Sequence, residues 1–271
     1  METLNPLRSF KGRGADFMVG ALPPGSTAVC GSGGGNFGQA IAYAARRHGL
    51  RAEVFVPASM SPVKLDRMTA LGATVHKTHD DPKAMATTYA AEKPERILVA
   101  DGKDARISEG AGTIGVELLR SRVDIDTVVV PVGDGALATG VAKWIKAQRP
   151  DVRIVGVGTS AAPAMAESWR AGTVIEIERR NTFTAGISIS KPWPEAVTRM
   201  RDLVDDMILV ADAAIVDTMH LAARTLGVLL EPAGAAGLAA VAGHDVPGDV
   251  LAVVLTGANA DLATYSELTV R

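Results

Sequence analysis

The stretch Thr127-Val128-Val129-Val130-Pro131-Val132-Gly133-Asp134-Gly135-Ala136-Leu137 joins an apolar run, a glycine loop and the start of a helical pattern. An apolar β-branched run without polar alternation is typical of a strand buried on both faces, as in a parallel sheet covered by helices. Backbone N–H groups in a glycine loop at a helix N-terminus form a cradle for an anion such as phosphate. The stretch therefore predicts an α/β fold with a candidate anion site, although a tight turn without a ligand would fit the same residues.

The same alternation of strand and helix patterns extends over the chain in both directions, which supports the α/β prediction. The expected strands are Thr27–Cys30, Ala52–Pro57, Thr74–Lys77, Ile97–Ala100, Thr127–Val132, Arg153–Val157, Ile208–Ala211 and Val250–Leu255. The expected helices are Phe37–His48, Val63–Leu71, Pro82–Ala91, Ala111–Arg120, Ala136–Gln148, Ala161–Ala171, Asp212–Thr225 and Ala233–Val241. The stretch Gly172–Pro194 is less regular, and we interpret it either as a loop across a site or as a plain surface connection.

Composition excludes several classes of function for these 271 residues. The 28 Lys and Arg residues nearly balance the 30 Asp and Glu residues, whereas a dedicated nucleic-acid surface usually has a basic excess. No apolar run approaches the roughly 18 residues of a membrane span, and residues 1–11 do not resemble a signal peptide. The single cysteine, Cys30, cannot form an internal disulfide. We therefore expect a cytoplasmic globular protein with no nucleic-acid partner and no membrane partner.

Three further segments carry candidate chemistry. Gly33, Gly35 and Gly38 satisfy a dinucleotide-binding fingerprint, but the following strand ends without the acidic residue that would hold a ribose, which disfavours a nicotinamide site. Thr256 places a hydroxyl at the end of the last expected strand. Lys11 stands among small residues and could be a buried reactive amine, although a lysine taken alone is more often an ordinary surface residue.

Taken together and in this order, four motifs resemble those of the fold-type II pyridoxal-phosphate enzymes, the tryptophan synthase beta-like superfamily. The resemblance is strongest to threonine and serine dehydratases and serine racemase. The motifs are Ser9-Phe10-Lys11-Gly12-Arg13-Gly14-Ala15, Gly33-Gly34-Gly35-Asn36-Phe37-Gly38-Gln39, Gly133-Asp134-Gly135-Ala136-Leu137 and Leu255-Thr256-Gly257-Ala258-Asn259. The resemblance extends from Leu4 to Asp261 and implies a two-lobed fold with parallel sheets covered by helices.

The resemblance implies a role for each motif in binding pyridoxal 5'-phosphate. Lys11 would hold the cofactor as an imine and later act as the base at the substrate Cα. Asn36 would bind the phenolic oxygen of the cofactor, Thr256 would face its pyridine nitrogen, and Gly186 would line its other side. The residues expected to bind the phosphate are Gly133, Asp134, Gly135, Ala136 and Leu137.

The substrate carboxylate is expected at the loop Ser32, Gly33, Gly34 and Gly35. This loop departs from the family pattern, because Gly33 replaces a serine that donates to the carboxylate. The sequence leaves open whether Ser32 substitutes for that serine. Gly34 stands where serine racemase has its second catalytic serine, which disfavours racemisation. Gly158 and Ala164 stand about where the racemase has acidic metal ligands, so we predict no metal site.

The resemblance predicts a lyase that removes the β-hydroxyl and the amine of L-threonine or L-serine, giving a 2-oxo acid and ammonia. Elimination or replacement on another amino acid, or a cofactor-binding homologue with impaired catalysis, remain alternatives. We expect a homodimer acting on a small amino-acid substrate. Residues 26–104 would form a small lobe, and residues 1–25 with 105–271 a large lobe. Because family members have several tens of residues before the lysine motif, the sequence predicts an N-terminally truncated variant or a late start assignment.

Overall fold

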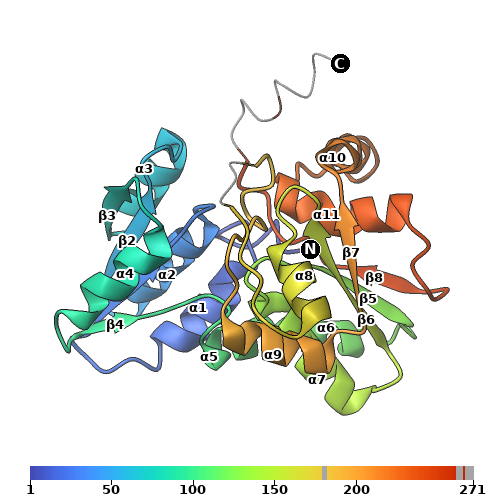
Figure 1. Cartoon of the computed structure of the whole chain (residues 1–271), viewed down its shortest axis with the longest axis horizontal. Coiled ribbons are helices and arrows are strands. Elements are labelled where there is room, and N and C mark those ends of the chain that lie inside the picture. The colour runs from blue at the N-terminus through green and yellow to red at the C-terminus, as the bar shows by residue number, and fades with distance from the viewer. Residues whose placement is uncertain (179–181, 261–264, 266–271) are drawn as a thin grey trace. The chain divides into compact units, whose positions relative to one another are not determined.

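The computed structural model describes residues 1–178, 182–260 and 265, and it confirms the predicted α/β fold. The chain forms two compact units, each with its own parallel sheet (Figure 1). Unit 1 comprises residues 1–10 and 111–271, and unit 2 comprises residues 11–110. The division differs from the expected lobes in that residues 11–25 and 105–110 belong to unit 2. The assignment of lobes around a cofactor remains a prediction.

Unit 2 contains a four-stranded sheet in the order β3-β2-β1-β4, and all of its strand pairs are parallel. Its elements in chain order are α1 (Lys11–Val19), β1 (Thr27–Gly31), α2 (Asn36–Arg47), β2 (Arg51–Pro57), α3 (Pro62–Ala70), β3 (Ala73–Thr78), α4 (Pro82–Ala91), β4 (Arg96–Leu98) and α5 (Ala105–Ala111). From β1 the chain adds β2 and β3 on one side of the sheet and then returns to add β4 on the other side of β1. The direction in which strands are added therefore reverses between β1 and β4. Ligands bind beyond the carboxyl ends of the strands at such a reversal in open α/β sheets.

Helices α1 and α5 of unit 2 approach closely because glycines stand at their contact. A Cβ atom added at Gly14 would lie 2.4 Å from the carbonyl oxygen of Ile107, and one added at Gly110 would lie 2.5 Å from that of Arg13. No side chain larger than hydrogen fits at either position without movement of the backbone. These two glycines therefore fix the position of α1, whose first residue is Lys11.

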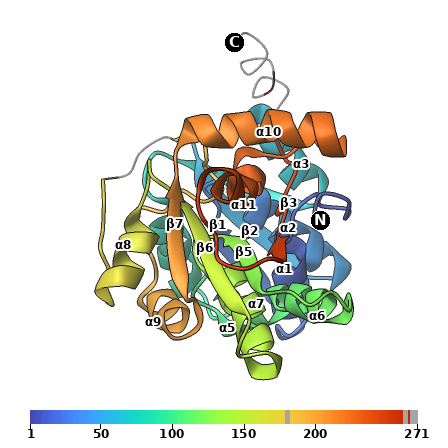
Figure 2. The same ribbon diagram turned by 90° about the vertical axis from the view of Figure 1, so that its right-hand side faces the viewer.

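Unit 1 repeats the sheet arrangement with the order β7-β6-β5-β8, again with parallel pairs throughout. Its elements are α6 (Thr113–Arg120), β5 (Thr127–Pro131), α7 (Ala136–Gln148), β6 (Arg153–Thr159), α8 (Ala164–Ala171), α9 (Pro194–Leu203), β7 (Asp206–Val210), α10 (Asp212–Leu226), α11 (Pro232–Gly243) and β8 (Leu251–Val253). Figure 2 shows β5, β6 and β7 of this sheet.

Helices cover both faces of the unit 1 sheet, as the apolar strand sequences predict. Successive residues of β5 point to opposite faces, so Val128 and Val130 pack with α7 and α9 while Val129 packs with α10 and α11. All three valines are fully buried. This double burial explains why β5 carries no polar residue between Val128 and Pro131.

The first ten residues of the chain are bound to its last strand region. Within unit 1, the N–H of Glu2 donates to Leu255 O at 2.9 Å, and the N–H of Phe10 donates to Thr256 O at 3.0 Å. The side-chain amide of Asn259 donates to Leu7 O at 2.7 Å, and Asn259 is buried. Residues 1–10 are therefore an integral part of unit 1.

Candidate active site

The loop Gly133–Leu137 of unit 1 connects β5 to α7 and has the geometry of an anion cradle. Gly135 is the residue before α7 and has a left-handed conformation with φ of 86°, which favours glycine. It has no side chain to bind the first-turn N–H groups of α7, so these groups point outward without a side-chain cap. The N-terminus of α7 can therefore accept an anionic group, as the sequence predicts.

Two other predicted site residues of unit 1 lie near this loop. A Cβ atom added at Gly133 would lie 3.1 Å from the carbonyl oxygen of Gly186, so the segment around Gly186 packs directly on the loop. A Cβ atom added at Gly186 would lie 2.8 Å from the Cβ atom of Ala233. The Thr256 hydroxyl in turn lies 3.5 Å from the carbonyl oxygen of Ala233. Thr256 is buried. Unit 1 thus brings together Gly133, Gly186 and Thr256, which are far apart in the sequence.

The loop Ser32–Asn36 of unit 2 has the same design as the loop of unit 1. It follows β1, and Gly35 precedes α2 in a left-handed conformation with φ of 91°. Gly33 is exposed, Gly34 is partly exposed, and Asn36 begins α2. The buried Ser32 hydroxyl accepts a hydrogen bond of 3.0 Å from the Gly38 N–H, so this side chain stabilises the loop. A role for Ser32 in substrate binding stays a prediction.

Lys11 lies in unit 2 near the loop that carries Asn36. Its side chain is only 13% exposed, which answers the question that the sequence leaves open between a buried and a surface lysine. The Nζ atom lies 6.0 Å from the centroid of the Phe37 ring, at the first turn of α2. Helix α1 and the loop before α2 therefore bring Lys11 and Asn36 to the same region of unit 2.

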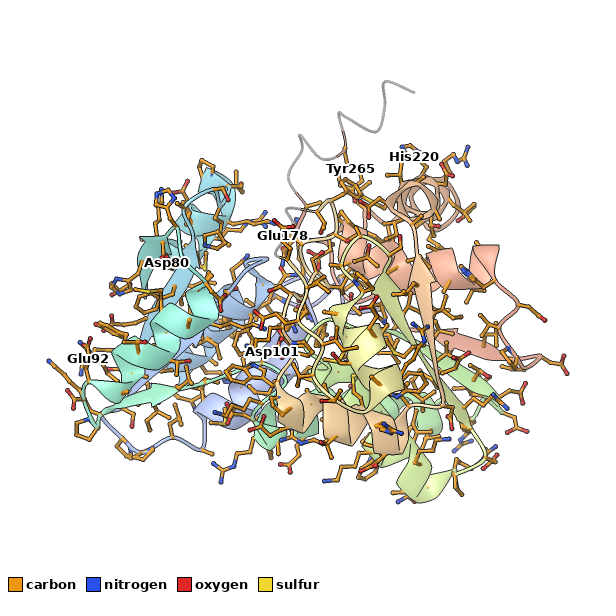
Figure 3. The ribbon with its side chains drawn as sticks, viewed as in Figure 1. Asp80, Glu92, Asp101, Glu178, His220 and Tyr265 are labelled. Carbon is orange, nitrogen blue, oxygen red and sulfur yellow. The ribbon has the colours of Figure 1, made fainter. Side chains whose placement is uncertain are left out.

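No motif of the sequence indicates Asp101, which forms an ion pair with Lys11 in unit 2. Asp101 follows β4, and β4 is the neighbour of β1 at the reversal of the strand order. Its position after an expected strand at Ile97–Ala100 could have indicated it, because ligands bind at the carboxyl ends of such strands. Figure 3 labels Asp101 among the side chains.

Each unit therefore offers functional groups at the equivalent end of its sheet. In unit 1 the loop after β5 carries the anion cradle, and Thr256 follows β8. In unit 2 the loop after β1 carries Asn36, and Asp101 follows β4. A helix N-terminus without a side-chain cap is suited to a phosphate group. A largely buried amine is suited to reaction with an aldehyde.

The comparisons with known proteins identify the family. The family model described as pyridoxal-phosphate dependent enzyme matches residues 1–257. The chain belongs to this family. It is 33% identical to L-threonine ammonia-lyase of Thermotoga maritima over 97% of this chain and 67% of that protein. It is 32% identical to serine racemase of Oryza sativa subsp. indica over 96% of this chain and 79% of that protein.

A solved structure of another family member has the same fold. The processed form of threonine deaminase isoform 2 from Solanum lycopersicum superposes with a TM-score of 0.91 at 28% identity, covering 99% of this chain and 76% of that chain. The residues of this chain fit the family cofactor, because the uncapped α7 N-terminus is suited to its phosphate and the buried amine of Lys11 to its aldehyde. Among the described residues, no cluster of three metal-ligating side chains occurs, and no helix is long and apolar enough to span a membrane.

Proposed function

We propose that this pyridoxal-phosphate dependent enzyme is an ammonia-lyase that converts L-threonine or L-serine to a 2-oxo acid and ammonia. The observation that carries the proposal is a largely buried Lys11 in a chain whose relatives include an L-threonine ammonia-lyase at 33% identity. Removal of the β-hydroxyl eliminates water, and a later hydrolysis consumes water and releases ammonia. The net reaction therefore needs no second substrate, oxidant or reductant.

We assign the cofactor-binding roles to residues of this chain as follows. The backbone N–H groups of Gly133, Asp134, Gly135, Ala136 and Leu137 bind the phosphate at the positive end of α7. Asn36 would donate to the phenolic oxygen of the bound cofactor, and Gly186 would line its ring. The Thr256 hydroxyl would face the pyridine nitrogen. Because a hydroxyl does not enforce protonation of that nitrogen as a carboxylate would, this residue favours loss of a β-substituent.

The chemistry of elimination requires a base at the substrate Cα and a means of orienting the substrate. Bound pyridoxal phosphate supplies an electron sink for the pair released when the Cα–H bond breaks. Lys11 Nζ accepts the Cα proton. The backbone of Gly33, Gly34 and Gly35, with Ser32, orients the substrate carboxylate. A Cβ atom at Gly33 would meet no atom within 4 Å, so this loop leaves room beside the carboxylate.

The test is a screen of amino acids for release of 2-oxo acid by the purified chain with pyridoxal phosphate. L-Threonine or L-serine is expected to give 2-oxo acid, together with a visible absorption band from the lysine-bound cofactor. Lys11→Ala should lose the band and the activity, whereas Lys93→Ala, which changes an exposed lysine of the same unit, should keep both. Absence of 2-oxo acid with every amino acid would refute the lyase proposal.

Racemisation is a second candidate because serine racemase of Oryza sativa subsp. indica is 32% identical. Removal and return of a proton on opposite faces of Cα needs two proton-transfer groups. Gly34 has no side chain to serve as the second group, so we expect elimination to predominate. Chiral analysis of serine during turnover measures the ratio of racemisation to elimination. Racemisation faster than 2-oxo acid release would favour the second candidate.

We also propose that the protein acts in the cytoplasm as a homodimer. The single cysteine, Cys30, is fully buried and requires no oxidising compartment. Large apolar side chains of Leu221, Leu226 and Leu229 are about half exposed in and just after α10, which is typical of a surface that is covered in an assembly. A solution mass of twice 28.1 kDa is the expected result, and a mass of 28.1 kDa would refute the dimer.

A further inference from the structure

Asp101 is held in a fixed position beside Lys11. It occupies a turn in which the N–H groups of Lys103 and Asp104 donate to Ala100 O, at 3.2 and 3.1 Å. The Ala100 N–H in turn donates to the Asp104 carboxylate at 2.7 Å. The turn is joined to the sheet by the Val99 N–H, which donates to Val29 O at 2.8 Å. A carboxylate in such a turn has little freedom to move away from its partner.

The ion pair between Asp101 and Lys11 is almost completely removed from solvent. The side chains are 8% and 13% exposed, and Lys11 Nζ donates to Asp101 Oδ2. The second oxygen, Oδ1, is buried and has no hydrogen-bond partner among the described residues. A buried carboxylate with an unpaired oxygen is costly, so its presence calls for a function beyond packing.

Cys30 and Asp104 lie near the pair and add no positive charge beside Asp101. The thiol of Cys30, at the end of β1, is fully buried, and burial together with the charge of Asp101 raises its pKa far above the usual range. Cys30 therefore stays a neutral thiol. Asp104 adds a second negative charge in the same turn, where it accepts the Ala100 N–H. Within unit 2, Asp101 forms an ion pair with the amine of Lys11.

We propose that Asp101 is a positioning residue for Lys11, which holds Nζ in place and balances its charge whenever the amine is protonated. The inference rests on the proposed function only in taking Lys11 as the reactive lysine. A base that accepts a proton in a nearly dry environment becomes a buried cation, and an adjacent carboxylate stabilises that cation. Asp101 thereby favours the protonated amine, both in the cofactor-free protein and after Lys11 accepts the Cα proton.

The test measures acylation of Lys11 in the cofactor-free full chain, with an amine-specific reagent and peptide mass spectrometry, from neutral to high pH. Only the neutral amine reacts. Asp101→Asn keeps the shape of the side chain and removes its charge, so the neutral fraction of Lys11 should rise. We expect labelling at pH 7 to become about tenfold faster, while the plateau rate at high pH stays within about twofold.

The plateau separates a charge effect from a change in exposure. If the plateau rises by the same factor as the rate at pH 7, Asp101 only shields Lys11, and the inference fails. Equal rates in wild type and Asp101→Asn at every pH would also overturn it. Asp101→Glu keeps the charge, so its rate at pH 7 should lie nearer to wild type than to Asp101→Asn.

Asp16→Asn is the matched control. Asp16 lies on α1, as Lys11 does, and pairs with Arg47 at the end of α2 and with His48 just after it. Removing the charge of Asp16 should leave the rate of Lys11 labelling within about twofold of the wild-type rate. If Asp101→Asn does not fold, Asp101→Ser, which is smaller and also neutral, takes its place. Labelling at pH 7 no faster than in wild type would then contradict the inference.

The outcomes for this inference and for the proposed function are independent. Acylation needs neither cofactor nor substrate, so a shifted pH dependence supports the pairing even if no amino acid yields 2-oxo acid. Conversely, lyase activity with an unchanged labelling profile in Asp101→Asn would support the proposed function and refute the role of Asp101.

Discussion

At the scale of single residues, Gly135 combines two demands that only glycine meets. Its φ of 86° is strained for other residues, and an added Cβ atom would lie 2.8 Å from Met200 Sδ. Gly135→Ala should therefore destabilise the protein by about 1–2 kcal/mol and displace the N–H groups that start α7. Weaker binding of pyridoxal phosphate, by about tenfold, is expected in a fluorescence titration.

Gly227 provides the control for Gly135. It ends α10 in the same left-handed conformation, with φ of 64°, but an added Cβ atom would meet nothing within 4 Å. Gly227→Ala should cost about 1 kcal/mol of stability from the backbone alone and leave cofactor affinity unchanged. Equal affinities for both variants would show that the loop does not bind the phosphate.

The sequence indicates the glycine loops and Lys11 more readily than Asp101, which pairs with Lys11. Gly135 and Lys11 belong to ordered motifs with recognisable spacing. Asp101 belongs to none of them, because its contact with Lys11 joins positions 90 residues apart through the turn after β4. A contact between residues so far apart in the sequence depends on the packing of the whole unit. A local sequence motif does not contain this information.

At the scale of elements, the position of α1 depends on its close contact with α5. In Gly14→Ala the new methyl group would overlap the Ile107 carbonyl, so the helices must separate. We expect a loss of about 1–3 kcal/mol in the free energy of unfolding. Because Lys11 begins α1, we also expect slower acylation of Lys11 and slower capture of the cofactor by its amine. Denaturant unfolding and absorbance measure the two effects.

Gly33→Ala is the comparison for Gly14→Ala, because the same methyl group at Gly33 would meet no atom within 4 Å. Its stability should lie within about 0.5 kcal/mol of wild type. Equal stability of Gly14→Ala and Gly33→Ala would contradict the tight packing of α1 on α5.

A polar cluster joins β2, β3 and α4 of unit 2. Glu53 accepts hydrogen bonds of 2.7 Å from His76 and from Tyr89, and the Phe55 and His76 rings stack at 4.6 Å. Burial pushes the pKa of Glu53 upward, but the hydrogen bonds from Tyr89 and His76 outweigh it, so the pKa is lowered. A carboxylate with a lowered pKa stabilises the folded state above its unfolded pKa and loses this contribution as the pH falls.

Glu53→Gln should therefore destabilise the protein by about 1 kcal/mol at pH 6–7, with the difference from wild type shrinking below about pH 4. Unfolding by urea at several pH values measures this dependence. Glu95→Gln, at an exposed position of the same unit, should show little effect at any pH. If the difference in unfolding free energy between Glu53→Gln and wild type is undiminished at pH 3, the ionised Glu53 carboxylate is not the source of the stability.

The sequence predicts the strands and the long helices well, because their apolar patterns and flanking glycines are distinct. All eight expected strands are present with small changes at their ends, and the bounds of α4 and α7 agree fully. Three helices were not predicted: α1, α5 and α9. Helix α1 contains two glycines and α5 has only seven residues, so local propensity is weak for both. Helix α9 carries a proline at its start and buries Ala196, Val197 and Met200, a spacing that could have indicated it.

At the scale of the whole molecule, the two units contain different natural probes. All three tryptophans, Trp144, Trp169 and Trp193, belong to unit 1, whereas Cys30 belongs to unit 2 and is fully buried. Many of the buried apolar residues of unit 2 are alanines, and its strand β3 is mostly only partly buried. We therefore expect unit 2 to be the less stable unit.

In a urea titration, Cys30 should become reactive to a thiol reagent at a lower urea concentration than that at which tryptophan fluorescence changes. Below the first transition Cys30 should be unreactive, because its raised pKa and its burial both suppress the thiolate. Coincident transitions of the two probes would instead mean that the chain unfolds as one cooperative body.

The binding of residues 1–10 to the last strand region has a consequence for synthesis on the ribosome. Glu2 and Phe10 emerge from the ribosome long before their partners, Leu255 and Thr256. Unit 2 is complete at Gly110, so it can fold while the first segment has nothing to bind. Residues 1–10 thus gain their binding partners only after Leu255 and Thr256 have been synthesised, and Lys11, the next residue in the sequence, gains its final anchorage only then.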